Sequence, residues 1–205
     1  MNYTLEVQLP EAVTFYGDPI CPWTLKSYKL LRRACDDLNI NLKYRPLSLK
    51  IINEKNEISD QMANKLDESF SLLLIGQRLI EKGFEDHAVK FYEIAADLLV
   101  NQKRIPNPTE VIQILEELGM DNPTEVVNQS DNSESTEHAI RDTHNKLKPL
   151  VGDDYGSPVV ILEPEKSGFF GPIVTDPDSG DAKETLLSFI LLSRSPSFSE
   201  IKRKR

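Results

Sequence analysis

Cys21 is the residue of this chain whose surroundings point most directly to chemistry. It follows residues 12–16, which have the pattern of a β-strand, and it precedes apolar side chains that recur at helical spacing. At a helix N-terminus, unpaired backbone N–H groups and the positive end of the helix dipole stabilise a thiolate. Pro22 suits the first helical turn, where its missing N–H costs nothing. The sequence therefore predicts that Cys21 is a nucleophile.

Asp18 and Thr24 are the neighbours that bear on the reactivity of Cys21. If the Asp18 carboxylate faced the sulfur, like-charge repulsion would oppose the helix dipole, and the sequence leaves open which effect is larger. Thr24 can donate a hydrogen bond to the Cys21 sulfur but cannot attack it. We therefore expect a cycle with one cysteine, in which a low-molecular-weight thiol releases the product or acts as the reductant.

Cys35 is expected to be a buried core cysteine that does not pair with Cys21. If the helix continues to Leu38, the two cysteines lie about 21 Å apart at 1.5 Å per residue. A disulfide needs Cα atoms within about 7 Å. Two cysteines at this spacing match no zinc pattern, so no metal site is expected.

The three histidines are dispersed along the chain, at His87, His138 and His144. His138 and His144 are six residues apart on a predicted helix, which puts them on different faces. We expect both to be surface side chains, with the alternative that one of them reaches the active-site cleft.

Composition limits the class of protein. The chain has 205 residues, of which 39% are hydrophobic, enough for a packed core. Its net charge of −9 argues against a broad nucleic-acid surface, and the basic run at residues 202–205 is more typical of a solvated chain end than of a localisation signal or membrane contact. Neither a secretory signal nor an apolar stretch near the ~20 residues of a membrane span is visible. A cytoplasmic protein is expected, without nucleic-acid or membrane partners.

Hydrophobic periodicity predicts a mixed α/β fold. The expected elements are strand 12–16, a helix from Cys21 to Leu38, strand 40–47, helices between 60 and 148, strands 158–162 and 168–172, and helix 181–193. The first three form a β-α-β unit with a parallel strand pair. This order is the thioredoxin topology with an insertion. We expect residues 11–58 and 149–205 to form a thioredoxin-like domain and residues 59–148 to form a helical lid.

Three short segments carry a family resemblance. DPICPWT at residues 18–24 resembles the active-site turn of DsbA-like thioredoxin-fold oxidoreductases, many of which have a second cysteine where this chain has Thr24. GSPVV at 156–160 resembles their cis-proline loop. GFFGP at 168–172, with residues 198–203, resembles the actinobacterial members described as mycothiol-dependent nitroreductases.

This resemblance implies a geometry and a co-substrate. The Ser157–Pro158 bond would be cis, and the Ser157 backbone would face Cys21 and offer its N–H and C=O to a substrate or bound thiol. Trp23, Phe169 and Phe170 would wall a pocket for a planar electrophile, although each alone is more often a core residue. The implied substrate- or thiol-binding residues are Pro22, Trp23, Thr24, Ser157, Pro158, Phe169 and Phe170. Mycothiol would be the co-substrate, with no tightly bound cofactor.

The sequence thus predicts a thiol oxidoreductase that uses Cys21 and a low-molecular-weight thiol to reduce a disulfide or small electrophile. Two alternatives stay open: a thiol transferase or isomerase, and a non-catalytic binding protein in which Thr24 marks a lapsed active site. Rapid alkylation of Cys21 would favour catalysis, whereas slow alkylation of both cysteines would favour the binding protein. The oligomeric state is also open, with a homodimer as one alternative.

Overall fold

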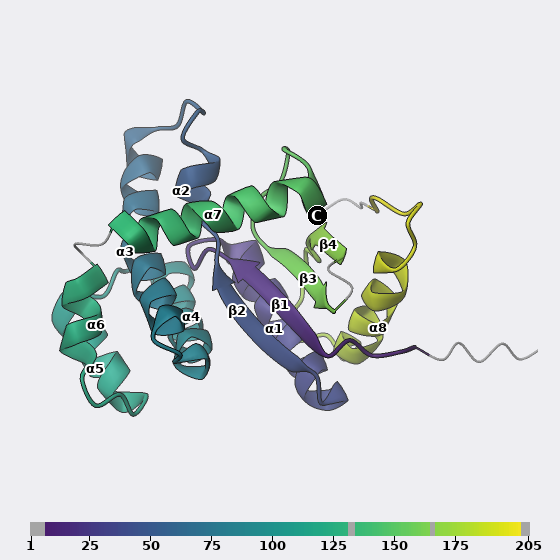
Figure 1. The fold of residues 1–205 in the computed structure, drawn as a ribbon, viewed down its shortest axis with the longest axis horizontal. Helices are drawn as coiled ribbons and strands as arrows, with labels where there is room; N and C mark the ends of the chain where they lie inside the picture. Colours follow the sequence, from purple (N-terminus) through teal and green to yellow (C-terminus); the bar gives the residue numbers. More distant parts are fainter. Residues whose placement is uncertain (1–6, 131–133, 165–166, 202–205) are drawn as a thin grey trace, which may run out of the picture.

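The structure is a computed structural model that describes residues 7–130, 134–164 and 167–201. A four-stranded sheet is flanked by helices (Figure 1). In chain order the elements are β1 (Ala12–Gly17), α1 (Pro22–Leu38), β2 (Asn41–Pro46), α2 (Leu49–Ile52), α3 (Asp60–Glu81), α4 (Glu85–Val100), α5 (Pro108–Glu117), α6 (Pro123–Ser130), α7 (Glu134–Val151), β3 (Val159–Glu163), β4 (Ser167–Phe170) and α8 (Ala182–Ser193). The predicted order of a β-α-β unit, helices and a β-β-α unit is confirmed. The basic run at 202–205 lies outside the described residues.

The sheet has the strand order β2-β1-β3-β4. β1 pairs in parallel with β2, which requires a crossover, and α1 provides it. β1 pairs antiparallel with β3, so that Tyr16 lies opposite Val159, and β3 pairs antiparallel with β4. The end of β1 and the start of β3 therefore meet at one end of the sheet. The loop before Cys21 and the Ser157–Pro158 turn adjoin this point.

Side chains alternate between two layers of the core, as the pleat of a strand requires. Val13 and Phe15 of β1 and Val160 and Leu162 of β3 are buried in the same cluster as the apolar face of α1. The opposite face of the sheet carries Val159, which packs in a second cluster with Leu47, Leu147 and Tyr155. In Figure 1, α7 crosses in front of the sheet while α1 lies behind it.

The predicted helical segment between the two halves of the sheet is confirmed. None of the residues described between 60 and 148 is in a strand, and α3 to α6 are grouped on the β2 side of the sheet (Figure 1). The aromatic side chains of Phe91 and Tyr92 bind α4 to the main core. Within the described ranges, the helices are too short or too polar to cross a membrane.

Candidate active site

Cys21 occupies the position immediately before α1, as predicted. Its backbone is extended (φ −81°, ψ 115°), and its carbonyl accepts a helical hydrogen bond from Leu25 N at 3.1 Å. Pro22 is the first helical residue, and the first turn of α1 contains no acidic side chain. The Cys21 side chain is 9% exposed. The sulfur therefore lies where the helix N-terminus favours a negative charge.

The Ser157–Pro158 turn faces Cys21 from the start of β3. The peptide bond between Ser157 and Pro158 is cis, and the Cys21 thiol donates a hydrogen bond to the Ser157 carbonyl oxygen at 3.5 Å. Ser157 is buried. The two segments that the sequence singled out, 136 residues apart at Cys21 and Ser157, are thus in direct contact.

Thr24 has a different partner from the one that the sequence suggested. Its hydroxyl lies 2.7 Å from the Ser157 hydroxyl, whereas the sequence indicated only that it could donate to the Cys21 sulfur. The Ser157 hydroxyl also accepts a hydrogen bond from Asp18 N at 3.0 Å. Because Thr24 is fully buried, its hydroxyl ties α1 to the proline turn and does not face the solvent.

Asp18 is a buried carboxylate that is held by donors from three segments. Oδ1 accepts hydrogen bonds from Ile20 N at 3.1 Å and from the Ser69 hydroxyl of α3, and Oδ2 accepts one from Leu49 N of α2 at 2.7 Å. Burial raises the pKa of Asp18, and these hydrogen bonds act in the opposite direction. The carboxylate is thus occupied by donors from the loop, α2 and α3. Ser69 was not anticipated from the sequence, because a contact across 51 residues leaves no local pattern.

His144 anchors the N-terminus of α2 and is buried, so the expectation of a surface side chain is wrong. Its Nε2 accepts a hydrogen bond from Ser48 N at 3.1 Å, and its Nδ1 lies 3.0 Å from the Tyr155 hydroxyl. Burial lowers the pKa of His144 to about 4, with a further contribution from the positive charge of Arg141. The signal was present in the sequence, because His144 lies four residues after Ile140 and three before Leu147, both fully buried. By contrast, His138 is exposed as predicted.

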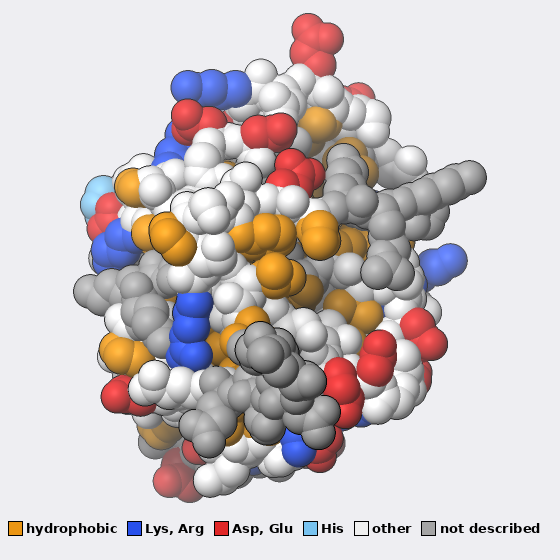
Figure 2. Space-filling view, turned by 90° about the vertical axis from the view of Figure 1, so that its right-hand side faces the viewer, with side chains coloured by type: hydrophobic (Ala, Val, Ile, Leu, Met, Phe, Trp, Pro, Cys, Tyr) orange, Lys and Arg blue, Asp and Glu red, His pale blue; other side chains and the backbone are white. Residues whose placement is uncertain are grey.

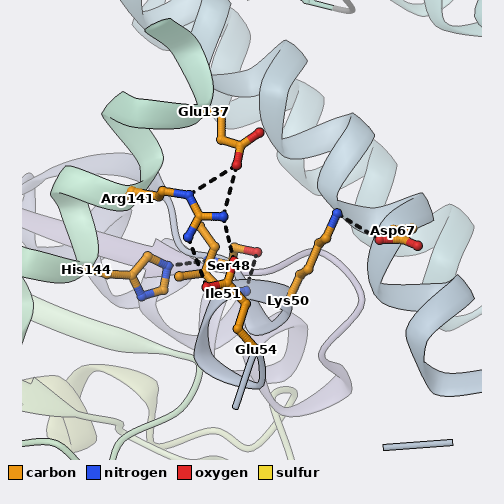
Figure 3. Close-up of polar contacts among 8 residues, drawn as sticks. All are labelled: Ser48, Lys50, Ile51, Glu54, Asp67, Glu137, Arg141 and His144. Carbon is orange, nitrogen blue, oxygen red and sulfur yellow. Dashed lines mark hydrogen bonds and ion pairs between the residues drawn. The ribbon is translucent and has the colours of Figure 1, made fainter. Parts of the chain in front are cut away.

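Charged side chains lie around the contact between His144 and the N-terminus of α2 (Figure 3). Arg141 of α7 reaches across to Glu54, with Nη1 3.0 Å from Oε2, and also pairs with Glu137 at 3.0 Å. On the other side of α2, Lys50 pairs with Asp67 of α3 at 2.8 Å. These pairs are partly exposed, so each adds modestly to stability. Together they link α7 and α3 to the short segment that supports Asp18.

The three aromatic residues proposed from the sequence lie in different surroundings. Trp23 is half-buried, with the Lys26 ammonium 5.1 Å from its ring centroid. Phe170 is 45% exposed, and its ring lies beside Gly156, next to the proline turn. Phe169 packs against Phe189 of α8, with ring centroids 5.6 Å apart. Figure 2 shows hydrophobic side chains across the middle of the face that carries β4 and α8.

A family model describes almost the whole chain. Residues 20–203 match the model described as "Rv2466c-like: Mycothiol-dependent nitroreductase Rv2466c". The chain belongs to this family. Its membership confirms the resemblance that the segments around Cys21, Pro158 and Phe170 carry.

Other proteins are similar to this chain in sequence or in structure. The uncharacterized protein Rv2286c of Mycobacterium tuberculosis is 23% identical over 178 residues, which cover 87% of this chain and 75% of the relative. The cytosolic disulfide reductase DsbM from Pseudomonas aeruginosa, in a structure with GSH, has a TM-score of 0.61 at 15% identity and covers 88% of this chain and 100% of its own. A 2-hydroxychromene-2-carboxylate isomerase has a TM-score of 0.59 at 15% identity, with coverages of 88% and 96%.

These comparisons fix the class of the Rv2466c-like protein. Its fold is the DsbA-like thioredoxin fold, as predicted. Its family is one of thiol oxidoreductases of the DsbA-like type, so the protein is an enzyme. The buried position of Cys35, which is fully inaccessible, also agrees with the sequence-based expectation.

Proposed function

We propose that the protein is a one-cysteine thiol oxidoreductase, in which Cys21 is the nucleophile and mycothiol is the reductant. The observation that carries the proposal is the contact between the Cys21 sulfur and the Ser157 carbonyl at 3.5 Å, at the N-terminus of α1. A disulfide substrate that lies against the proline turn would present its sulfur to Cys21. The family membership supports mycothiol as the small thiol.

The proposed cycle balances with one equivalent of free mycothiol for each mixed disulfide. The Cys21 thiolate attacks a mixed disulfide between mycothiol and a substrate, forms a disulfide with the mycothiol sulfur and releases the substrate thiolate. A second mycothiol thiolate then attacks the mycothiol sulfur of this disulfide. Mycothiol disulfide leaves, and the Cys21 thiolate is regenerated. The mixed disulfide is thus reduced to the substrate thiol while one free mycothiol is oxidised, and the mycothiol disulfide that leaves joins it to the mycothiol released from the substrate.

The environment of Thr24 supports a cycle without a second protein thiol. A hydroxyl cannot resolve a disulfide, and that of Thr24 is already engaged by Ser157. Cys35 is buried on α1, and burial raises the pKa of its thiol to about 12. External thiol is therefore the resolving nucleophile.

The remaining site residues are assigned by their positions. We assign Pro22 and Trp23 on α1, together with Ser157, Pro158 and Phe170 around the turn, to the binding of the thiol and substrate. Phe169 packs against Phe189 of α8 and would support the wall of the pocket without contacting the substrate.

We also infer that segment 59–148 acts as a lid on a domain formed by 11–58 and 149–205. The hydrogen bond between Ser69 of α3 and Asp18 supports this inference, because it brings the segment against the loop before Cys21. Such a thiol-dependent cycle fits the reducing cytoplasm.

Adduct mapping tests this function. Reduced protein is incubated with mycothiol disulfide, glutathione disulfide or bis(2-hydroxyethyl) disulfide, and adducts are located by intact mass and peptide mapping. We expect one adduct per chain, at Cys21, in the wild type and in Cys35→Ser. Cys21→Ser should give none. An unmodified Cys21 under conditions that modify a model thiol would contradict the proposal and favour the non-catalytic binding protein.

A further inference from the structure

The backbone of Asp18 connects the two segments that form the active site. Its N–H donates to the Ser157 hydroxyl at 3.0 Å, and its carbonyl accepts a hydrogen bond from Cys21 N at 3.1 Å. The Cys21 thiol in turn donates to the Ser157 carbonyl at 3.5 Å. Asp18, Cys21 and Ser157 therefore form a closed ring of hydrogen bonds, and a shift of Asp18 changes how the sulfur lies against the proline turn.

The side chain of Asp18 links this ring to the segment 59–148. The buried carboxylate accepts hydrogen bonds from Ile20 N at 3.1 Å, from Leu49 N at 2.7 Å and from the Ser69 hydroxyl. Ile20 belongs to the same loop as Asp18, and Leu49 is the first residue of α2. Of these three donors, only Ser69 comes from the segment 59–148, and its side chain is fully buried.

The position of Ser69 is set by the packing of α3. Its neighbour Phe70 lies in a buried cluster with Ile140 of α7. Asp67, two residues before Ser69, pairs with Lys50 of α2 at 2.8 Å (Figure 3). Contacts with α7 and α2 therefore hold the part of α3 that presents the hydroxyl to Asp18.

The hydroxyl of Ser69 matters because a buried carboxylate is stable only while hydrogen-bond donors replace the water that it has lost. Without this hydroxyl, Oδ1 of Asp18 keeps Ile20 N as its donor, and the carboxylate moves toward the remaining backbone N–H groups. Because the backbone of Asp18 bonds to Cys21 and Ser157, this movement displaces the sulfur from the proline turn. A small displacement of a reacting atom slows a reaction that depends on alignment.

We propose that Ser69 is a positioning residue for Cys21 and that it acts through Asp18. It holds the loop so that the sulfur faces the Ser157 backbone, where the disulfide substrate lies in the proposed function. The inference rests on that proposed function. It gives the segment 59–148 a part in aligning the nucleophile, in addition to covering the site.

The test compares two reactions of Cys21, each followed by peptide mapping. Exchange with mycothiol disulfide needs a substrate aligned along the proline turn, whereas alkylation by iodoacetamide needs only access to the sulfur. For Ser69→Ala, we expect exchange to be roughly tenfold slower and alkylation to keep the wild-type rate. Ser71→Ala is the matched control, because the Ser71 hydroxyl is exposed and bonds to the Glu68 carbonyl of its own helix at 2.7 Å. Both of its rates should equal those of the wild type.

The outcomes separate this inference from the proposed function. A wild-type Cys21 that forms no adduct with mycothiol disulfide overturns both. A reactive wild type with an unchanged exchange rate in Ser69→Ala overturns the inference and leaves the function standing. Equal slowing of exchange and alkylation also overturns it, because general damage to the fold would slow both.

A second variant keeps the inference testable if Ser69→Ala does not fold. Asp18→Asn preserves the shape of the side chain but replaces one acceptor oxygen with an amide donor, so the three donors can no longer all be satisfied. We expect the same selective loss of exchange with mycothiol disulfide. Unchanged exchange, or equal slowing of exchange and alkylation, overturns the inference here as well.

Discussion

The hydroxyl of Thr24 lies 2.7 Å from the hydroxyl of Ser157. Thr24, three positions after Cys21, is therefore bonded to the proline turn that faces Cys21. This hydroxyl pair connects α1 to the start of β3, and Asp18 N adds a third member. The arrangement keeps the site assembled without a second thiol.

Thr24→Cys should change how the mixed disulfide is resolved without changing the fold. The new sulfur would stand three residues from Cys21 across the first helical turn, within disulfide reach. The variant should therefore resolve its own mixed disulfides and depend less on added thiol. Turnover of bis(2-hydroxyethyl) disulfide as a function of mycothiol concentration measures this dependence. In the double variant Thr24→Cys/Cys21→Ser the effect should vanish, and an unchanged thiol dependence in Thr24→Cys would contradict the prediction.

Mild oxidation of the folded monomer should leave no internal disulfide. Cys21 precedes α1 and Cys35 lies in its fourth turn, about 21 Å further along the axis. Cys35 is also fully buried. Peptide mapping after oxidation should find the two cysteines in separate peptides that are not joined. A crosslinked Cys21–Cys35 peptide from protein that is still folded would refute this.

His144 should make the protein less stable as the pH falls from about 6.5 to about 4. The pKa of the buried imidazole is lowered from 6.5 to about 4, so the unfolded chain takes up the proton first. The stability that neutral His144 provides is present above pH 6.5 and is lost as the pH falls toward 4, by about 3 kcal/mol. Urea denaturation at a series of pH values measures this loss.

Two variants isolate the effect of His144 from other groups. Asp18 acts in the opposite direction, because its raised pKa makes its contribution largest at low pH and smaller as the pH rises. This trend cancels when the wild type is compared with His144→Gln, whose stability should vary less between pH 6.5 and 4. His138→Gln, at an exposed position, should keep the wild-type slope. Equal slopes in the wild type and His144→Gln would disprove the assignment.

Local patterns predicted the parts of the site that are built from neighbouring residues. The strand before Cys21, the helix after it and the Pro22 position all follow from periodicity and from the rules for helix N-termini. The cis bond at Pro158 and its contact with Cys21 followed from the family resemblance, and both are present.

Contacts between distant segments could not be predicted in the same way. The hydrogen bond between Asp18 and Ser69 joins a loop to α3, and nothing in either local sequence specifies the other. The partner of Thr24 was missed for the same reason, because a hydroxyl can bond to any nearby acceptor and tertiary packing selects Ser157. The spacing of His144 from Ile140 and Leu147 indicated a buried position on the helix, but the polar character of histidine suggested a surface position.

The most direct test of the central claim compares Cys21→Ser with Cys35→Ser in turnover of bis(2-hydroxyethyl) disulfide with mycothiol. A serine hydroxyl is far less ionised than a thiol near pH 7, so the first substitution removes the nucleophile with little loss of volume. Cys21→Ser should abolish thiol-dependent turnover, and Cys35→Ser should largely preserve it. Equal turnover in the wild type and Cys21→Ser, at the same substrate and thiol concentrations, would show that Cys21 is not the reactive centre.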